Sequence, residues 1–407
     1  MSHTCFVNNT RKVEMIMRIK KTVTIGTVGA GYPAYLHGNG LEKVGGVDVR
    51  LKTICDTNLE LAQKVMDRYG YEEMTANFDD LLADPEIDVI DIITPPFLHV
   101  PMAIKAMRAG KHVICEKPLT GYFGKPGEEN VGDTPKSVMY AEVLKTMDEL
   151  KAVIEETGMK FMYAENFVYA TPIQNTARFL RAKQSKVLFQ HGFVGLKGSS
   201  SPVAGIWNKS GGGQLMRNGT HPLSGMLYLK QVEAKARGEE ITVKSISADV
   251  GKTTACLSEH EHRHIAAHPV DVEDYAAVTV TFSDGTKLLV VASDTVLGGT
   301  ANTVDVYCND AAYRLTMTPS KVMDTYFLDE DGIEDEVLGE MLPSKLGWNH
   351  AFVSDDVIRG YQGEMQDFMD CIAFDREPAA NFDVAYETAK VMYAAYVAAE
   401  EGRRVDF

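Results

Sequence analysis

Hydrophobic residues follow one pattern in the first third of the chain and another in its second half. From Thr22 to about Leu119, short apolar runs alternate with segments of helical spacing. This alternation is typical of a parallel sheet covered by helices on both faces. From Val187 onward, apolar positions recur at every second residue, as in strands with one buried face. We therefore expect an α/β chain, with a doubly wound parallel sheet followed by a second domain built on an open sheet.

These patterns divide the chain into an N-terminal arm, a first domain with an insertion, and a second domain. The expected ranges are 1–20 for the arm, 21–164 for the first domain, 121–136 for the insertion and 165–407 for the second domain. Strands of the second domain are expected at 187–195, 241–250, 276–282, 287–293, 303–308 and 312–317. Asp284-Gly285 predicts a tight hairpin between two of these strands. Helices are expected at 357–374 and 384–401, followed by an edge strand at 405–407.

A glycine-containing turn follows the first predicted strand. Gly29, Gly31 and Ala34 occupy the three small-residue positions of the dinucleotide fingerprint G-x-G-x-x-G/A, and Tyr32 and Pro33 lie between the last two. The first glycine permits the sharp turn and the second lets a pyrophosphate approach the backbone. The alanine lets the next helix, whose N–H groups face the phosphates, pack on the sheet. An ordinary strand-to-helix turn is the alternative interpretation.

Asp56 ends the second predicted strand, where the fingerprint expects a carboxylate for the ribose hydroxyls. An acidic residue repels a 2′-phosphate, so we expect NAD rather than NADP. The alternative is that Asp56 caps the helix beginning near Leu59.

Composition narrows the range of partners. The net charge of −16 comes without a compensating basic stripe, which argues against nucleic acid or an anionic membrane as a partner. The six cysteines are scattered without C-x-x-C spacing, as expected of reduced thiols in a cytoplasmic protein. No apolar run reaches the roughly 18 residues that a membrane-spanning helix needs. The first 20 residues also lack the apolar core of a signal peptide.

Two further motifs carry a family resemblance. Gly110-Lys-His-Val-Ile-Cys-Glu-Lys-Pro-Leu119 resembles the Glu-Lys-Pro signature of the glucose–fructose oxidoreductase / inositol dehydrogenase family, and Thr94-Pro-Pro-Phe-Leu-His99 resembles its Thr-Pro-x-x-x-His loop. The resemblance implies an NAD(P)-dependent sugar oxidoreductase whose second domain contains a large, mostly antiparallel sheet. It places the active site between the domains and implies a homodimer or homotetramer formed through the exposed sheet face. The cofactor contacts implied in these regions are Thr94, Pro95, His99, Glu116, Lys117 and Asn166.

Lys117 is the first catalytic candidate. Proline fixes it at the carboxyl end of a parallel strand, where open sheets bind ligands. Partial burial beside Glu116 would tune its amine for proton transfer with a substrate hydroxyl. The alternative is a solvated loop lysine paired with Glu116.

His221 is the second catalytic candidate. Gly211-Gly-Gly-Gln-Leu-Met-Arg-Asn-Gly-Thr-His221 resembles the family's Gly-Gly-Gly-x-Leu-x-Asp-x-Gly-x-His run, which implies that His221 is the catalytic histidine. A structural, capping histidine is the alternative. The family aspartate four residues earlier is Arg217 here, and Ser224 replaces a second common aspartate. Arg217 cannot accept a proton. It could grip an anionic substrate group by a bidentate fork or pair with Glu165.

Several other residues are candidates for substrate contacts. The insertion 121–136 follows Lys117 and could form a flap presenting Tyr122 and Phe123, or be a surface insertion without such a role. The resemblance places polar contacts near Glu165, and Tyr169 stands where many members have arginine. Trp348 and His350 are expected in a long loop, either as a sugar-stacking wall or as loop filling.

Residues 258–268 contain four of the eleven histidines. Alternating histidines with acidic neighbours could bind a metal. Because nicotinamide accepts the hydride, the implied reaction needs none, and we expect a solvated or substrate-rim loop without a metal site.

Three functions remain open from the sequence. The first is NAD-dependent oxidation of a secondary hydroxyl of a sugar, glycoside or polyol, with Lys117 and His221 handling the proton. The second is glycoside cleavage by transient oxidation, elimination, hydration and re-reduction. The third is a non-catalytic sugar-binding or NAD-binding protein.

Overall fold

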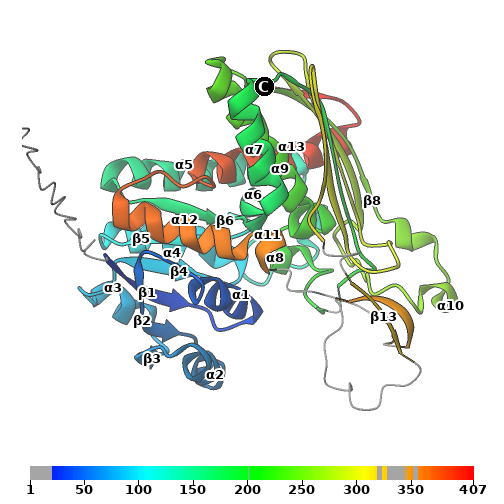
Figure 1. The fold of residues 1–407 in the computed structure, drawn as a ribbon. Coiled ribbons are helices and arrows are strands. Elements are labelled where there is room, and N and C mark those ends of the chain that lie inside the picture. Colours follow the sequence, from blue (N-terminus) through cyan, green and yellow to red (C-terminus); the bar gives the residue numbers. More distant parts are fainter. Residues whose placement is uncertain (1–20, 200, 319–322, 328–343, 345, 352–355) are drawn as a thin grey trace, which may run out of the picture.

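The computed structural model describes residues 21–199, 201–318, 323–327, 344, 346–351 and 356–407. The side chains of residues 323–327, 348–351 and 356–357 lie outside this description, as does the expected N-terminal arm 1–20. Figure 1 shows two large sheets, with most helices beside the first sheet or against one face of the second.

The first sheet has six parallel strands in the order β3-β2-β1-β4-β5-β6. Its strands are β1 (Thr22–Val28), β2 (Asp48–Cys55), β3 (Glu73–Thr75), β4 (Val89–Ile92), β5 (His112–Glu116) and β6 (Phe161–Ala164). The helices between these strands are α1 (Tyr32–Leu41), α2 (Leu59–Tyr69), α3 (Phe78–Ala83), α4 (His99–Arg108) and α5 (Lys136–Thr157). The strand order reverses between β1 and β4, and such a reversal opens a ligand crevice at the carboxyl ends of the strands.

The second sheet has seven strands in the order β12-β11-β7-β10-β9-β8-β15. They are β7 (Val187–Gly195), β8 (Val243–Gly251), β9 (Tyr275–Phe282), β10 (Lys287–Ser293), β11 (Ala301–Cys308), β12 (Ala312–Thr316) and β15 (Val405–Asp406). Only β7 and β10 pair in parallel, and β9 and β10 form the expected hairpin through Asp284 and Gly285. The fold class expected from the sequence is therefore confirmed. A separate two-stranded sheet pairs β13 (Met323–Phe327) with β14 (Gly347–Ala351).

Helices cover one face of the second sheet. The helices of this half of the chain are α6 (Asn166–Tyr169), α7 (Thr171–Lys183), α8 (Trp207–Ser210), α9 (Thr220–Arg237), α10 (Glu259–His262), α11 (Asp356–Arg359), α12 (Tyr361–Phe374) and α13 (Phe382–Glu401). Of these, α7, α9 and α13 pack against the sheet. Short 3₁₀ turns lie at Pro96–Leu98, Val131–Asp133 and Thr253–Cys256. In Figure 1, α7 and α9 lie beside the sheet, and α12 runs along the first domain.

The last long helix joins the two sheets through one hydrophobic core. Buried residues of α13 such as Val391 and Met392 belong to the same cluster as Ile114 of β5 and Val278 of β9. Helix α13 packs against α5 on one side and against α9 and β8 on the other. A helix that is apolar on most of its faces is typical of such a central position. In the part of the chain that the structure describes, no helix has the length and apolarity to cross a membrane.

One expectation about a helix is corrected, and one alternative is excluded. The helix expected at 357–374 is interrupted at Gly360, which has φ +100° and whose added Cβ would lie 2.2 Å from the Asn166 oxygen. Helix α12 therefore begins only after this close backbone contact. Asp56 does not cap α2, because the Asn58 side chain accepts from the N–H groups of Glu60 and Leu61.

Candidate active site

The glycine turn has the form that a pyrophosphate requires. Gly29 has φ +106°, and a Cβ there would lie 2.7 Å from the Ile93 oxygen. A side chain is therefore excluded at this position. Gly31 is the N-cap of α1 with no side-chain hydrogen bond, and a Cβ there would meet only Pro33, at 3.8 Å. The start of α1 thus presents backbone N–H groups to open space, as an anion site does. Tyr32 is 72% exposed beside it.

Asp56 is tied to this turn. Its Oδ2 accepts from the Ala30 N–H at 2.7 Å and its Oδ1 accepts from the Asn58 N–H at 2.7 Å. These bonds hold a half-exposed carboxylate at the end of β2, next to the turn. Each carboxylate oxygen has further lone pairs, so the group remains able to accept from a ribose hydroxyl.

His99 is buried and links two segments of the backbone, so it is not an exposed cofactor contact. It is buried, with Nδ1 2.9 Å from the Pro118 oxygen and Nε2 2.8 Å from the Thr94 oxygen. Burial lowers the pKa of His99, and the two carbonyls offset this only in part. The ring therefore joins the end of β4, where Thr94 and Pro95 are half-exposed and exposed, to the Lys117-Pro118 segment after β5.

Glu116 faces inward, away from the expected cofactor position. Its Oε2 accepts from the Lys117 N–H at 2.8 Å, and its Oε1 lies 3.2 Å from His37 Nε2. The other ring nitrogen of His37 lies 3.0 Å from Asp91. Burial lowers the pKa of His37, but Asp91 and Glu116 together raise it well above its ordinary value. His37 was missed from the sequence, where a histidine on α1 and an aspartate within β4 gave no signal of their contact.

The Lys117 amine reaches across to the second domain. Its Nζ donates to the Arg217 carbonyl at 2.9 Å. Arg217 lies four residues before His221, so Lys117 contacts the turn that leads into the helix that carries His221. This contact uses one of the three ammonium donors and leaves the others for a ligand.

The His221 ring forms a close polar contact with a buried carboxylate. Its Nδ1 lies 2.6 Å from Glu165 Oε1, and its ring stacks on Phe167 with centroids 4.6 Å apart. Glu165 is fully buried and also accepts from Thr220 at 3.3 Å. A carboxylate at Nδ1 fixes the tautomer in which Nδ1 carries the proton and Nε2 is the acceptor. Glu165, expected to contact substrate, therefore serves instead as the partner of His221.

Arg217 does not pair with Glu165. The turn preceding α9, Leu215–Gly219, is a π-helix. Its wider turn moves position 217 out of the simple four-residue register with position 221. The guanidinium forms an ion pair with Asp294, at the end of β10. Burial raises the pKa of Asp294 to about 6 despite the attraction of Arg217.

Glu273 fixes the start of this segment. Its two carboxylate oxygens accept from the Gly213 and Leu215 N–H groups at 2.8 and 2.9 Å. The sequence gave no indication of this contact, because Glu273 lies 60 residues from Gly213.

Two other expected contacts, Tyr169 and Asn166, have structural partners. Tyr169 is buried, donates to Asp367 and accepts from the Ala380 N–H, which places it in the core beside α12 rather than at the site. The Asn166 amide donates to the Arg359 carbonyl at 2.9 Å and so holds the α11–α12 junction. Trp348 and His350 fall in strand β14 rather than in a loop, and their side chains lie outside the described residues.

The insertion 121–136 is docked on the second domain. The Tyr122 N–H donates to Tyr393 at 2.6 Å, and the Tyr122 carbonyl accepts from the Trp207 indole at 3.1 Å. Further along, the Gly132 N–H donates to Asp271 at 3.0 Å. These anchors oppose the flap interpretation. The Tyr122 side chain is half-buried and packs on the core.

The histidine-rich segment forms an exposed loop. Residues 259–262 form the short helix α10, capped by Ser258, and Arg263 bonds to the rings of His260 and His264. Across the described residues, no three His, Cys, Asp or Glu side chains come together as metal ligands would.

Comparisons with known proteins agree with this geometry. Residues 23–125 match the family model of an oxidoreductase family with an NAD-binding Rossmann fold. Residues 199–407, half of the chain, match the C-terminal alpha/beta domain of the same family. The chain belongs to this oxidoreductase family. Its resemblance to the glucose–fructose oxidoreductase / inositol dehydrogenase group is thereby confirmed, as is NAD as the cofactor of its first domain.

Individual relatives match over shorter segments. A levoglucosan dehydrogenase from Pseudarthrobacter phenanthrenivorans is 36% identical over 117 residues, which are 27% of this chain and 29% of that protein. A glycosyl hydrolase family 109 protein from Shewanella amazonensis is 36% identical over 109 residues, 24% of this chain and 23% of that protein. The aligned segments thus span less than a third of either relative.

The fold is shared over nearly the whole chain. GenD2 from gentamicin A biosynthesis, crystallised with NAD, has a TM-score of 0.74 at 21% identity, covering 95% of this chain and 97% of that one. At this identity the comparison supports the fold alone.

Proposed function

We propose that the protein oxidises a secondary hydroxyl of a sugar, glycoside or polyol with NAD. The observation that carries the proposal is the contact between the Lys117 amine and the turn that leads into the His221–Glu165 pair. The name of the levoglucosan dehydrogenase relative supports a carbohydrate substrate.

The residues present fit the cofactor. Gly29 and Gly31 leave room for a pyrophosphate, the start of α1 supplies N–H donors, and Asp56 lies where a ribose would be held. Bound NAD supplies the acceptor for the hydride leaving the substrate carbon.

The side chains of this chain handle the proton. In our proposal Lys117 Nζ donates a hydrogen bond to the substrate oxygen, and His221 Nε2 accepts the hydroxyl proton. Glu165, bound to Nδ1, stabilises the imidazolium that forms. Phe167 holds the plane of the ring. The reaction therefore leaves a ketone and a protonated histidine, which releases its proton to water.

Sugar oxidation by the purified protein tests this function. We expect NADH to accumulate with at least one member of a panel containing glucose, galactose, myo-inositol and levoglucosan. Lys117→Ala should lower kcat/KM by roughly 10²- to 10⁴-fold, the usual contribution of a proton-handling group. Lys125→Ala, an exposed lysine in the insertion, is the matched control and should change little.

Two results would contradict the proposal. Cleavage of an aryl glycoside that needs catalytic NAD and yields no net NADH would establish the redox-neutral alternative. NAD binding without turnover of any sugar or glycoside would establish a binding protein.

We also propose a cytoplasmic homo-oligomer. The face of the second sheet away from the helices carries the stacked pair Phe189–Tyr307, and Phe189 is 37% exposed. Because the helices pack on the opposite face of the sheet, this face is available to a second copy of the chain. Light scattering should report a dimer or tetramer, and Phe189→Asp should shift it toward monomer.

A further inference from the structure

A cavity of about 520 Å³ lies on the sheet side of the turn that precedes α9. Its walls come from Ser199, the segment 201–205, the segment 266–274 and the end of β10. Arg217 and Asp294 form part of the lining. Cavities of this size hold small organic ligands.

Arg217 connects this cavity to the catalytic amine. Its carbonyl oxygen binds Lys117 Nζ at 2.9 Å, while its side chain lines the cavity. Arg217 thus contacts the amine through its backbone and lines the cavity with its side chain.

Some polar atoms of the Arg217–Asp294 pair have no hydrogen-bond partner in the part of the chain that the structure describes. Arg217 Nε and Asp294 Oδ1 are buried and have no hydrogen-bond partner among the described residues. Asp294 itself is only 2% exposed. An unsatisfied buried donor or acceptor costs about 1–3 kcal/mol, so a ligand that satisfies both is favoured.

The neighbouring carboxylates are already occupied. Asp274 accepts from the backbone and hydroxyls of Thr253 and Thr254, and Glu273 holds the Gly213 and Leu215 N–H groups. Within the described ranges, the Arg217–Asp294 pair therefore retains one unsatisfied donor and one unsatisfied acceptor. A hydroxyl both donates and accepts, and adjacent hydroxyls of a sugar ring match such a pair. An anion does not, because Asp294 already compensates the Arg217 charge.

The rest of the lining suits a sugar ring. Ser199 and Ser201 offer hydroxyl groups, and Ala204 and Val272 offer small apolar surfaces for ring C–H groups. We propose that this cavity is a subsite for a second sugar ring, so that the preferred substrate is a disaccharide or related glycoside rather than a free monosaccharide. This inference rests on the proposed oxidation of a sugar hydroxyl at Lys117 and His221.

Substrate preference in a cavity-filling variant tests the inference. The probes are glucose and its disaccharides with 1,2, 1,3, 1,4 and 1,6 linkages, assayed by NADH formation. In the wild-type protein we expect at least one disaccharide to exceed glucose tenfold or more in kcat/KM. Ala204→Trp should remove this preference while leaving kcat/KM for glucose within about twofold. Val203→Trp is the matched control, because Val203 is 48% exposed and is not part of the lining.

The outcomes distinguish failure of the subsite from failure of the proposed oxidoreductase function. Oxidation of monosaccharides with no disaccharide preference, or with a preference that survives Ala204→Trp, would overturn the subsite and leave the oxidoreductase function intact. Absence of turnover with every probe in the wild-type protein would overturn the proposed function and the subsite with it. Equal melting temperatures of the two tryptophan variants exclude misfolding as the cause of a lost preference.

Discussion

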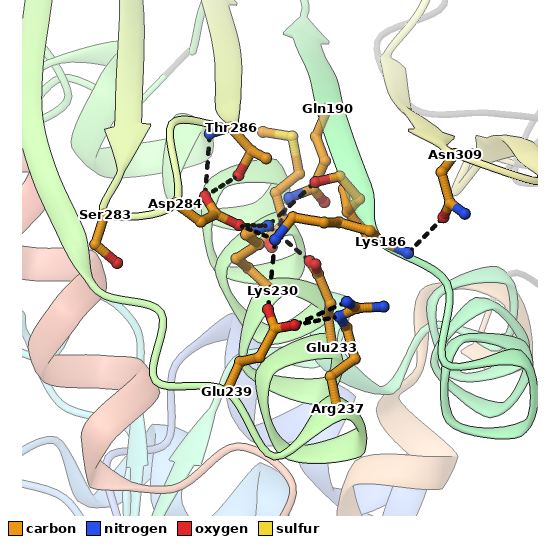
Figure 2. A network of polar contacts seen from close by, with 12 residues as sticks. Lys186, Gln190, Lys230, Glu233, Arg237, Glu239, Ser283, Asp284, Thr286 and Asn309 are labelled. Atoms are coloured by element: carbon orange, nitrogen blue, oxygen red, sulfur yellow. Dashed lines mark hydrogen bonds and ion pairs between the residues drawn. The ribbon is translucent and has the colours of Figure 1, made fainter.

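The two ends of helix α9 both carry buried charges, but they use them differently. At the C-terminal end, Lys230 is 2% exposed, and its Nζ donates to the Val187 carbonyl, Glu233 and Asp284 at 3.1, 2.7 and 3.1 Å. Figure 2 shows this network between α9 and the sheet, with Thr286 donating to Asp284. All three ammonium donors therefore have acceptors within the protein.

The N-terminal end leaves donors free. The Arg217 side chain is 18% exposed, and its Nε has no partner among the described residues. The Lys117 amine uses one of its three N–H donors for the hydrogen bond to the Arg217 carbonyl. A saturated buried cation stabilises the fold, whereas an incompletely satisfied one at a cavity wall can bind a ligand. From this difference we assign the C-terminal cluster to stability and the N-terminal one to the proposed active site.

Removing the saturated cation should produce the largest effect on stability. Lys230→Met would leave Glu233 and Asp284 without their shared partner and should lower the free energy of unfolding by about 3–5 kcal/mol. Lys235→Met on the exposed face of α9 should change it by less than about 0.5 kcal/mol. Urea unfolding measures both values. A tenfold fall in kcat of folded Lys230→Met would contradict the assignment of this end to stability alone.

At the N-terminal end of α9, Asp294→Asn should change how the free energy of unfolding depends on pH. The Asp294 pKa rises from 3.8 to about 6 on folding, chiefly through burial. The folded protein therefore binds this proton more tightly, and the corresponding stability is present below pH ~4 and lost as the pH rises through ~6. The shift corresponds to about 3 kcal/mol.

The asparagine variant cannot ionise, so its stability relative to the wild-type protein should increase by about that amount between pH 4 and pH 7. Urea unfolding at several pH values measures the difference. Asp249→Asn, an exposed aspartate on β8, is the control. A difference that is independent of pH would show that Asp294 ionises normally in the folded protein.

The fold and the cofactor site of the first domain could be predicted from the sequence because the motifs that indicate them are local. The Gly29 turn, Asp56 and the Lys117-Pro118 segment each lie directly after a strand, and the parallel sheet brings the ends of its strands together. The two kinds of hydrophobic period likewise predicted the parallel and the mostly antiparallel sheet. The sequence left open whether Asp56 caps α2, because Asp56 and Asn58 are both favourable capping residues, and only the coordinates show which one the N–H groups face.

The second half of the site depends on distant partners and on a local irregularity. Asp294 lies 77 residues from Arg217, and Glu165 lies 56 residues before His221. Periodicity treats 215–221 as regular helix and aligns Arg217 with His221. The π-turn at Leu215–Gly219 instead allows one side chain to reach the sheet and the other to reach Glu165. Long-range charge pairing of this kind leaves no mark in spacing.

Glu165→Gln compares the two ends directly, because it changes a buried carboxylate at the catalytic end. Glutamine keeps the size of the side chain but cannot stabilise an imidazolium, so we expect kcat to fall by about 100-fold, or about 2.7 kcal/mol. The free energy of unfolding should change far less than in Lys230→Met. Glu155→Gln on the surface of α5 controls for loss of charge. An unchanged kcat with a strongly lowered stability would make Glu165 the counterpart of Glu233, and the two ends of α9 would then be alike.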